Sequence, residues 1–196
     1  MELVPIVFSS GWASGVNAYA TVLVLGLFGR FTDVDAFPVP DALTRTDVLV
    51  AAAVLYAVEF VADKIPYVDS VWDVVSTGIR PTVGAVIALL VSGDASSLDQ
   101  ALYVTFGGGT ALVSHLVKSG LRLAINASPE PFSNVGASLA EDGAVAGVVT
   151  LAVYHPWIAL GVSAALLVLG LVLLALAFRY VRRGWRRWNR DRRAPA

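Results

Sequence analysis

Long apolar runs recur along the whole of this chain, separated by short polar stretches. They cover about residues 12–29, 48–62, 81–93, 98–125, 143–154 and 158–181. A helix needs about 20 predominantly apolar residues to cross the hydrocarbon core of a bilayer. The pattern therefore predicts an all-α, polytopic membrane helix bundle of about six spans, in which polar flanks extend the three shorter runs.

The composition supports a membrane protein over a soluble domain. The chain is 57% hydrophobic and 15% charged, whereas soluble domains are about 45–50% apolar and about 25% charged. It has no cysteine, so disulfides and thiolate metal sites are excluded. We expect a single transmembrane domain over residues 1–181 in the cell membrane, followed by a basic tail over residues 182–196.

The distribution of lysine and arginine predicts the orientation. The tail, "RYVRRGWRRWNRDRR", is strongly basic, and basic segments beside membrane spans remain in the cytoplasm. Six spans then place both termini in the cytoplasm, a placement that Arg30 and Arg45 weakly oppose. In the tail, arginines alternate with Trp185 and Trp188, which is typical of an anchor on anionic lipid. Docking of a partner or of nucleic acid is the alternative.

The charged stretch over residues 59–81, "EFVADKIPYVDSVWDVVSTGIRP", has a weak counterpart later in the chain. A shift of 63 residues aligns Glu59 with Arg122, Asp63 with Asn126 and Pro66 with Pro129. Transporters are often built from such repeats, with the site where the two units meet. The span count places both stretches on one side, which predicts a parallel repeat of helix–polar hairpin–helix units. The alternatives are an inverted repeat and a chance likeness.

Opposite charges occupy corresponding places in the two stretches. Ionisable side chains inside a membrane usually pair or line a wet cavity. We therefore expect Glu59 to meet Arg122, and Arg80 to meet Glu141 or Asp142. The alternative is that these groups are hydrated at the interface. For three other residues of the stretches we prefer that alternative: Lys64, Asp69 and Glu130.

The segments around the prolines predict short, non-spanning helices. Residues 68–79 have an amphipathic helical pattern too short to span, and "SPEPFSNVGASL" is a looser counterpart. Each is expected to lie in the interface or to re-enter the membrane. Irregular backbone cannot face lipid, so we predict that residues 63–80 and 126–142 pack together in the cytoplasmic half of the membrane.

A basic stripe follows one face of the run over residues 98–125. His115, Lys118 and Arg122 have helical spacing and together could attract an anion or a lipid phosphate. His115 could pass protons, because its ordinary pKa is about 6.5; the alternative is a neutral histidine bonded to a neighbouring helix.

Small residues mark two further segments, "SSGWASGVNAYA" and "FGGGTALVSH". The simpler interpretation is close helix packing. The alternative is a broken helix whose N-terminus faces an anion. Asn17 is interpreted as an interhelical hydrogen-bond donor.

Several of these motifs together resemble one family. The segments "GWASGVNAYATVLVLGLFGR", "EFVADKIPYVDSVWD", "IRPTVGA" and "SPEPFSNVGASLAEDG…HPW" are similar to those of the DUF4126 family of small bacterial membrane proteins. The resemblance covers nearly the whole chain up to the basic tail. It implies a multi-spanning membrane protein of unknown function, and it assigns no catalytic or binding residues.

The sequence favours a transporter or channel-like protein for an ion or a small solute, anionic solutes included. The alternatives are a lipid-headgroup-binding or lipid-translocating protein, a membrane scaffold with an Arg/Trp tail, and, last, an intramembrane enzyme. No enzyme signature, cofactor motif or metal-ligand spacing is present in the sequence, and a homo-oligomer is possible. The predicted pathway residues are Glu59, Asp63, Arg80, His115, Lys118, Arg122, Asn126, Glu141 and Asp142.

Overall fold

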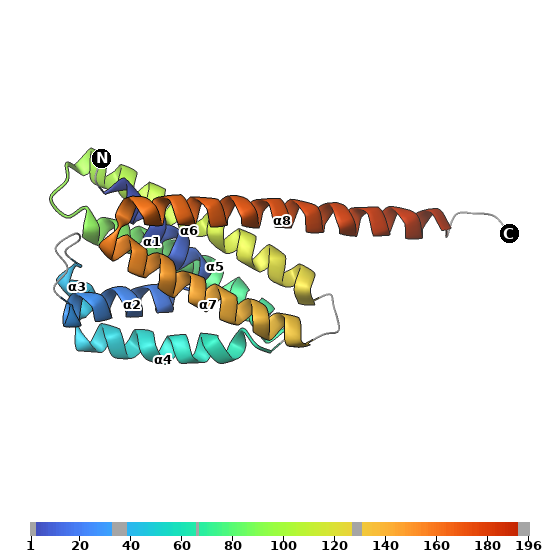
Figure 1. The fold of residues 1–196 in the computed structure, drawn as a ribbon, viewed down its shortest axis with the longest axis horizontal. Helices are drawn as coiled ribbons and strands as arrows, with labels where there is room; N and C mark the ends of the chain where they lie inside the picture. Colours follow the sequence, from blue (N-terminus) through green and yellow to red (C-terminus); the bar gives the residue numbers. More distant parts are fainter. Residues whose placement is uncertain (1–2, 33–38, 66, 127–130, 192–196) are drawn as a thin grey trace.

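The computed structural model describes residues 3–32, 39–65, 67–126 and 131–191, with the side chains of residues 131–132 and 184–191 left out. Within these ranges the regular structure is entirely helical, which confirms the all-α prediction. The helices are α1 (Val4–Val16), α2 (Ala18–Phe31), α3 (Asp41–Thr44), α4 (Thr46–Ala62), α5 (Val68–Val91), α6 (Ser97–Asn126), α7 (Pro131–Tyr154) and α8 (Pro156–Asp191). Figure 1 shows the long helices lying side by side, with α8 extending beyond the others at one end.

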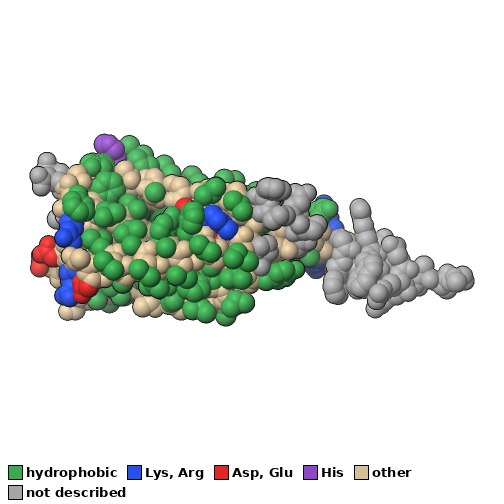
Figure 2. Space-filling model, turned by 90° about the horizontal axis from the view of Figure 1, so that it is seen from below, with side chains coloured by type: hydrophobic (Ala, Val, Ile, Leu, Met, Phe, Trp, Pro, Cys, Tyr) green, Lys and Arg blue, Asp and Glu red, His purple; other side chains and the backbone are tan. Residues whose placement is uncertain are grey.

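Three helices are long and apolar enough to cross a membrane: Val68–Val91, Ser133–Tyr154 and Pro156–Arg183. These spans indicate a membrane protein. Much of the outer surface suits lipid, because large apolar side chains such as Val54, Val74 and Phe178 are more than half exposed. Figure 2 shows one face covered largely by hydrophobic side chains, with charged groups gathered toward one end.

The first apolar run is broken rather than continuous. It forms α1 and α2, of 13 and 14 residues, which meet at the extended residue Asn17. The start of α1 and the end of α2 both approach residues 39–44, so the two helices form a hairpin that enters from one end and turns back inside the bundle (Figure 1). Each arm is about 20 Å long, too short to span. The predicted first span is therefore wrong.

Two of the predicted short segments are instead parts of long helices. Residues 68–79 continue through Pro81 into the next apolar run, and together they form α5. Tyr67, with a φ of 72°, turns the chain sharply before α5 begins. Most of "SPEPFSNVGASL" lies in α7, whereas Pro66 and Pro129, two of the aligned repeat positions, lie outside the described residues. The amphipathic stripe over residues 68–79 is only the first part of α5. A pattern read over so few residues does not show that the helix continues beyond them.

Glycines let neighbouring helices of the bundle approach closely. A Cβ on Gly11 of α1 would lie 2.7 Å from the carbonyl oxygen of Gly107 on α6. A Cβ on Gly84 of α5 would lie 2.7 Å from that of Ala111. These contacts hold α6 against α1 and α5, as the small-residue pattern predicted.

The first helix begins and the last helix finishes at different ends of the bundle. α1 begins beside the connection between α5 and α6, and α8 runs away from that connection, with Gly170 and Leu174 against the later part of α6 (Figure 1). The first helix therefore begins at one end and the last helix finishes at the other. The expectation of both termini on one side counted the α1–α2 hairpin as one crossing.

Candidate functional site

Buried charged side chains gather where the tip of the α1–α2 hairpin meets α4, α5, α6 and α7. We call this set the ion network: Glu59, Asp63, Asp73, Arg80, His115, Lys118, Arg122, Glu141 and Asp142. Arg80, Arg122, His115 and Glu59 are among the largest side chains that are fully buried. Lone charges are costly inside a membrane protein, so the partners of each group decide what the site can do.

Arg80 of α5 joins α4, α5 and α6. Its Nη2 donates to Oε1 of Glu59 at 2.8 Å, and its Nη1 lies 3.1 Å from Oδ1 of Asp73. The second contact is an ion pair without hydrogen-bond geometry, since Oδ1 of Asp73 has no hydrogen-bond donor. Nη1 donates instead to Nδ1 of His115 at 2.8 Å.

Two cations of α6, one turn apart, bind carboxylates of α4 and α7. Nζ of Lys118 donates to Oδ2 of Asp63 at 2.8 Å and lies 3.5 Å from Glu141 and 3.7 Å from Glu59. Arg122 donates from Nε and Nη2 to the two oxygens of Glu141, at 3.1 and 2.6 Å. Such two-pronged contacts are the strong, directional form of the arginine–carboxylate pair.

These partners correct the pairs predicted from the sequence. Glu59 meets Arg80 and Lys118 rather than Arg122, and Arg80 meets Glu59 and Asp73 rather than the acids of α7. The prediction assumed that corresponding positions of the two stretches face each other. Glu59 and Arg80 instead lie on consecutive antiparallel helices and pair within their own half of the chain, as Arg122 and Glu141 do in theirs, whereas Lys118 joins the two halves through Asp63.

His115 is held as a neutral ring. A guanidinium can only donate, so Nδ1 of His115 must accept from Arg80. The ring proton then lies on Nε2, which donates to Oγ1 of Thr77 at 2.9 Å, and Thr77 donates onward to the carbonyl of Asp73. This arrangement agrees with the alternative of a neutral histidine bonded to a neighbouring helix.

Charged groups stabilise the break between α1 and α2. The last carbonyls of α1 have no partners within the helix and carry partial negative charge. Lys118 donates to the carbonyl of Val16 at 3.0 Å, and Arg80 lies 3.5 Å from that of Gly15. On the other side of the break, Oδ1 of Asn17 accepts from the amide of Ala20, capping α2. Both helix ends thus find partners deep inside the bundle.

Asn17 also connects this break to α7. Its Nδ2 donates to Oδ1 of Asp142 at 3.1 Å, which agrees with the prediction of an interhelical donor. Asp142 therefore lies beside the N-terminus of α2, where a negative charge is favoured by the helix dipole. The acids of α7 are divided, because Glu141 faces Arg122 and Asp142 faces the hairpin tip.

The two predicted hairpins touch at the end of the network. Asn126 donates to both carboxylate oxygens of Asp69 at 2.9 Å, and Lys64 donates to Ser138 at 3.2 Å. Arg122 also donates to the carbonyl of Asp63. The expected packing of residues 63–80 against 126–142 is therefore present. The preferred interpretation of Asp69 as hydrated is wrong, since it is buried and bonded; Glu130 lies outside the described residues.

The ion network holds more carboxylates than cations. Five carboxylates face three cations, which leaves two negative charges in formal count. Lys64 and Asp69, at the periphery, add one charge of each sign. Three buried carboxylate oxygens have no hydrogen-bond partner: Oε2 of Glu59, Oδ1 of Asp73 and Oδ2 of Asp142. That of Asp73 lies 3.1 Å from Nη1 of Arg80, so Glu59 and Asp142 hold the two oxygens that no cation approaches as closely. An unpaired buried oxygen beside surplus negative charge is suited to accept a proton or a cation.

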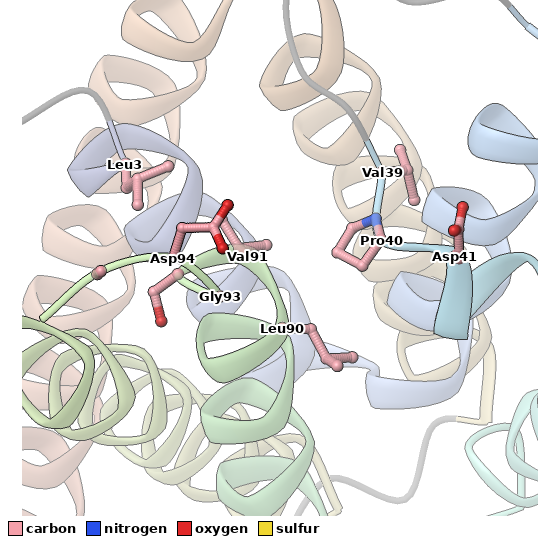
Figure 3. A pocket seen from close by; sticks show the side chains of 10 residues that line it. Leu3, Val39, Pro40, Asp41, Leu90, Val91, Gly93 and Asp94 are labelled. Atoms are coloured by element: carbon pink, nitrogen blue, oxygen red, sulfur yellow. The ribbon is translucent and has the colours of Figure 1, made fainter. Parts of the chain in front are cut away.

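One hollow adjoins this network, and another lies at the far end of the bundle. One, of about 360 Å³, lies between α1, α6, α7 and α8 and includes Lys118 and Glu141 in its lining. The other, of about 510 Å³, opens at the far end of the bundle, with Asp41 and Asp94 on its walls (Figure 3). Leu90 lines this second hollow, about 15 Å along α5 from Arg80, so it does not reach the network.

Sequence reasoning missed three participants: Asp73, Thr77 and Asn134. The first two share the face of α5 that carries Arg80, seven and three residues before it, and this pattern could have revealed them. Asn134 accepts from Arg122 at 2.6 Å and lies seven residues before Glu141 on α7, a helical spacing that could have revealed it in the same way. No group of three or more candidate metal ligands is present within the described ranges.

Comparison with known proteins identifies one family. The model of a domain of unknown function, DUF4126, matches residues 4–176. The match includes every residue of the ion network and the hairpin tip. A search of curated proteins and a search of solved structures both gave no match.

Proposed function

The chain belongs to the DUF4126 family, a family of unknown function, and we propose that it is a small membrane transporter in which the ion network exchanges protons or monovalent cations. The observation that carries the proposal is the surplus of buried carboxylates around the tip of a broken helix hairpin. Transporters commonly place coupling-ion sites at interrupted helices inside the membrane. Ionisable groups at such depth mark ion paths and proton relays.

Glu59 and Asp142 are the proposed proton-accepting groups. Each has one carboxylate oxygen fixed by a donor and one buried oxygen without a partner. Protonation of the free oxygen would reduce the surplus negative charge. It would also weaken the contact of Glu59 with Arg80 or that of Asp142 with Asn17 at the hairpin tip, so proton binding and movement of the tip would be linked.

The anion alternatives receive less support from this geometry. The lipid-headgroup hypothesis needed the basic stripe to be free for a phosphate. Lys118 and Arg122 instead face Asp63 and Glu141 at 2.6–2.8 Å, and His115 is neutral. An anion would have to displace these carboxylates, at the cost of leaving them buried and unpaired.

The proposal includes a topology. Arg179, Arg182 and Arg183 lie at the far end of α8, so that end belongs in the cytoplasm by the positive-inside rule. The start of α1 then lies on the opposite side. Reporter fusions at Met1 and Ala196 are expected to report opposite sides of the membrane, and reporters on the same side would contradict this topology.

Charge displacement on a supported membrane tests the exchange. Proteoliposomes adsorbed to a sensor receive a step in pH or in Na⁺, and the transient current is recorded. We expect a current with the parent protein that is at least tenfold smaller with Asp142→Asn and with Glu59→Gln. The exposed variant Asp47→Asn is the matched control and should keep the full current. A parent current no larger than that of protein-free liposomes would overturn the proposal.

A further inference from the structure

The hollow between α1, α6, α7 and α8 has the size and walls of a small-molecule site. Its volume is about 360 Å³, within the range of about 300–1,000 Å³ for ligand pockets. Most of its lining is apolar, with Val117 and Leu121 from α6 and Leu166 and Leu173 from α8. Its polar lining comes from Ser114, Lys118 and Glu141.

Small residues keep this cavity open. On α7, Ala137, Ala140 and Ala144 lie three and four residues apart on one face, and all three line the cavity. None is large enough to fill the space beneath α8. On α8, a Cβ at Gly170 would lie 2.6 Å from a methyl of Val117, so α8 already approaches α6 as closely as it can.

The polar side chains that line the cavity differ in how much of their surface remains available to a ligand. Ser114 donates to the carbonyl of Trp12, and the side chain of Lys118 is only 3% exposed, with Nζ held by Val16 and Asp63. The side chain of Glu141 is 22% exposed, although Arg122 binds both of its oxygens. The charged surface offered to a ligand is therefore mainly carboxylate, with the surplus negative charge of the network behind it.

The access route adds a second constraint on the ligand. α8 forms the outer wall of the cavity, and its side chains Leu169 and Leu173 line the cavity while remaining about half exposed on the apolar surface. A molecule that dissolves in the bilayer can approach by this route. A small inorganic ion gains nothing from the apolar walls, and an anionic amphiphile is repelled by the surplus carboxylates.

We propose that this cavity binds a lipophilic cation, an organic ammonium or phosphonium with apolar substituents, with Glu141 as its counter-ion. The proposal rests on the proposed transport function and names the substrate class of the same site. The apolar substituents fill the space between α7 and α8, and the cationic centre lies beside the exposed side of the Glu141 carboxylate. Binding there competes with Arg122 for Glu141, which links the ligand to the rest of the ion network.

Two probes of the same shape and opposite charge test the inference. Binding of tetraphenylphosphonium and of tetraphenylborate is measured by equilibrium dialysis on the full-length protein in lipid nanodiscs, against empty nanodiscs. We expect the cation to bind at least tenfold more tightly than the borate. Equal binding of both probes would show an apolar hollow without charge selectivity and would overturn the inference.

Three variants locate the site. Ala140→Phe fills the cavity and leaves every network residue in place, so it should reduce binding of the cation at least tenfold. Glu141→Gln should do the same, and Glu141→Asp, which keeps the charge, should retain most of the binding even if Glu141→Gln folds poorly. Asp47→Asn is the control and should bind as the parent does. Unchanged binding with Ala140→Phe would place the cation elsewhere.

The outcomes separate this inference from the proposed function. Currents after a pH step without binding of tetraphenylphosphonium would leave the transport proposal standing and end the inference. Binding without any current would leave a cation site in a protein that does not exchange ions, which ends the transport proposal.

Discussion

Two arginine–carboxylate pairs of nearly equal length lie at opposite extremes of burial. Arg45 lies 2.7 Å from Asp47 at the start of α4, and their side chains are 66% and 65% exposed. Arg80 lies 2.8 Å from Glu59 in the ion network, and their side chains are 1% and 0% exposed. The distance between the charged atoms is therefore a poor measure of what a pair contributes.

The difference lies in what remains when one partner is removed. Water hydrates Asp47 whether or not Arg45 is present, so the exposed pair contributes little. The buried carboxylate of Glu59 has no water to replace Arg80, and an unpaired charge remains inside the protein. The exposed pair is also local, two residues apart, whereas the buried pair joins two helices across 21 residues.

Removal of Arg80 should have the largest effect. Arg80→Gln removes the only cation within reach of Asp73 and leaves Glu59 with the more distant Lys118, at 3.7 Å, among the described residues. Breaking a buried pair costs about 3–5 kcal/mol. We expect a much lower melting temperature in detergent, measured by following tryptophan fluorescence during thermal unfolding. Arg45→Gln is the matched control, since it removes an arginine at a similar contact distance. Equal melting temperatures for the two variants would refute the comparison.

Charge exchange should distinguish the observed partners from the predicted ones. Glu141→Arg with Arg122→Glu restores a pair that the structure contains, so the double variant should recover more than half of the stability lost by either single variant. Glu59→Arg with Arg122→Glu exchanges groups that do not pair and should recover none. The measurement is again thermal unfolding in detergent, as a double-mutant cycle. Recovery only in the second exchange would show that the partners are those predicted from the sequence.

Asn17→Ala should have an intermediate effect. It removes the cap of α2 and the donor to Asp142, and loss of a helix cap costs about 0.5–2 kcal/mol. The control is Thr82→Ala, whose exposed hydroxyl only donates back to the carbonyl of Gly78 on its own helix. The melting temperature of Asn17→Ala should lie between those of Thr82→Ala and Arg80→Gln. A melting temperature equal to that of Thr82→Ala would mean that the hairpin tip needs no cap.

The exposed pair should give the smallest effect. Arg45→Gln and Asp47→Asn, alone or together, are expected to leave the melting temperature unchanged within measurement error. Added salt should not change this result, because screening removes an interaction that is already weak. A loss of stability approaching that of Arg80→Gln would mean that exposure is not the deciding variable.

The helical class of the fold and the gathering of most site residues could be predicted from the sequence. Apolar runs indicate helices, and charges at helical spacing indicate shared faces: Glu59 on α4 with Asp63 at its C-cap, and Lys118 with Arg122 on α6. Periodicity reveals which residues share a face. It does not reveal which neighbour that face meets, so the partners of Glu59 and Arg80 were predicted incorrectly.

The sequence also did not favour a helix break at Asn17 over a continuous span. The run over residues 12–29 has no proline, and its composition is that of an ordinary span. The groups that stabilise the helix ends at this break, Lys118, Arg80 and Asp142, lie far along the chain. A local pattern cannot report partners supplied by distant segments, so the broken helix was one of two alternatives.

The α1–α2 hairpin has a consequence for how the protein is made. Its tip is held by Lys118, which lies 102 residues after Val16, and by Asp142, which lies 125 residues after Asn17. When the ribosome has produced both arms of the hairpin, neither partner has yet been synthesised. The hairpin therefore cannot make its final contacts until α6 and α7 are in place, so a segment synthesised early is completed only late in biogenesis.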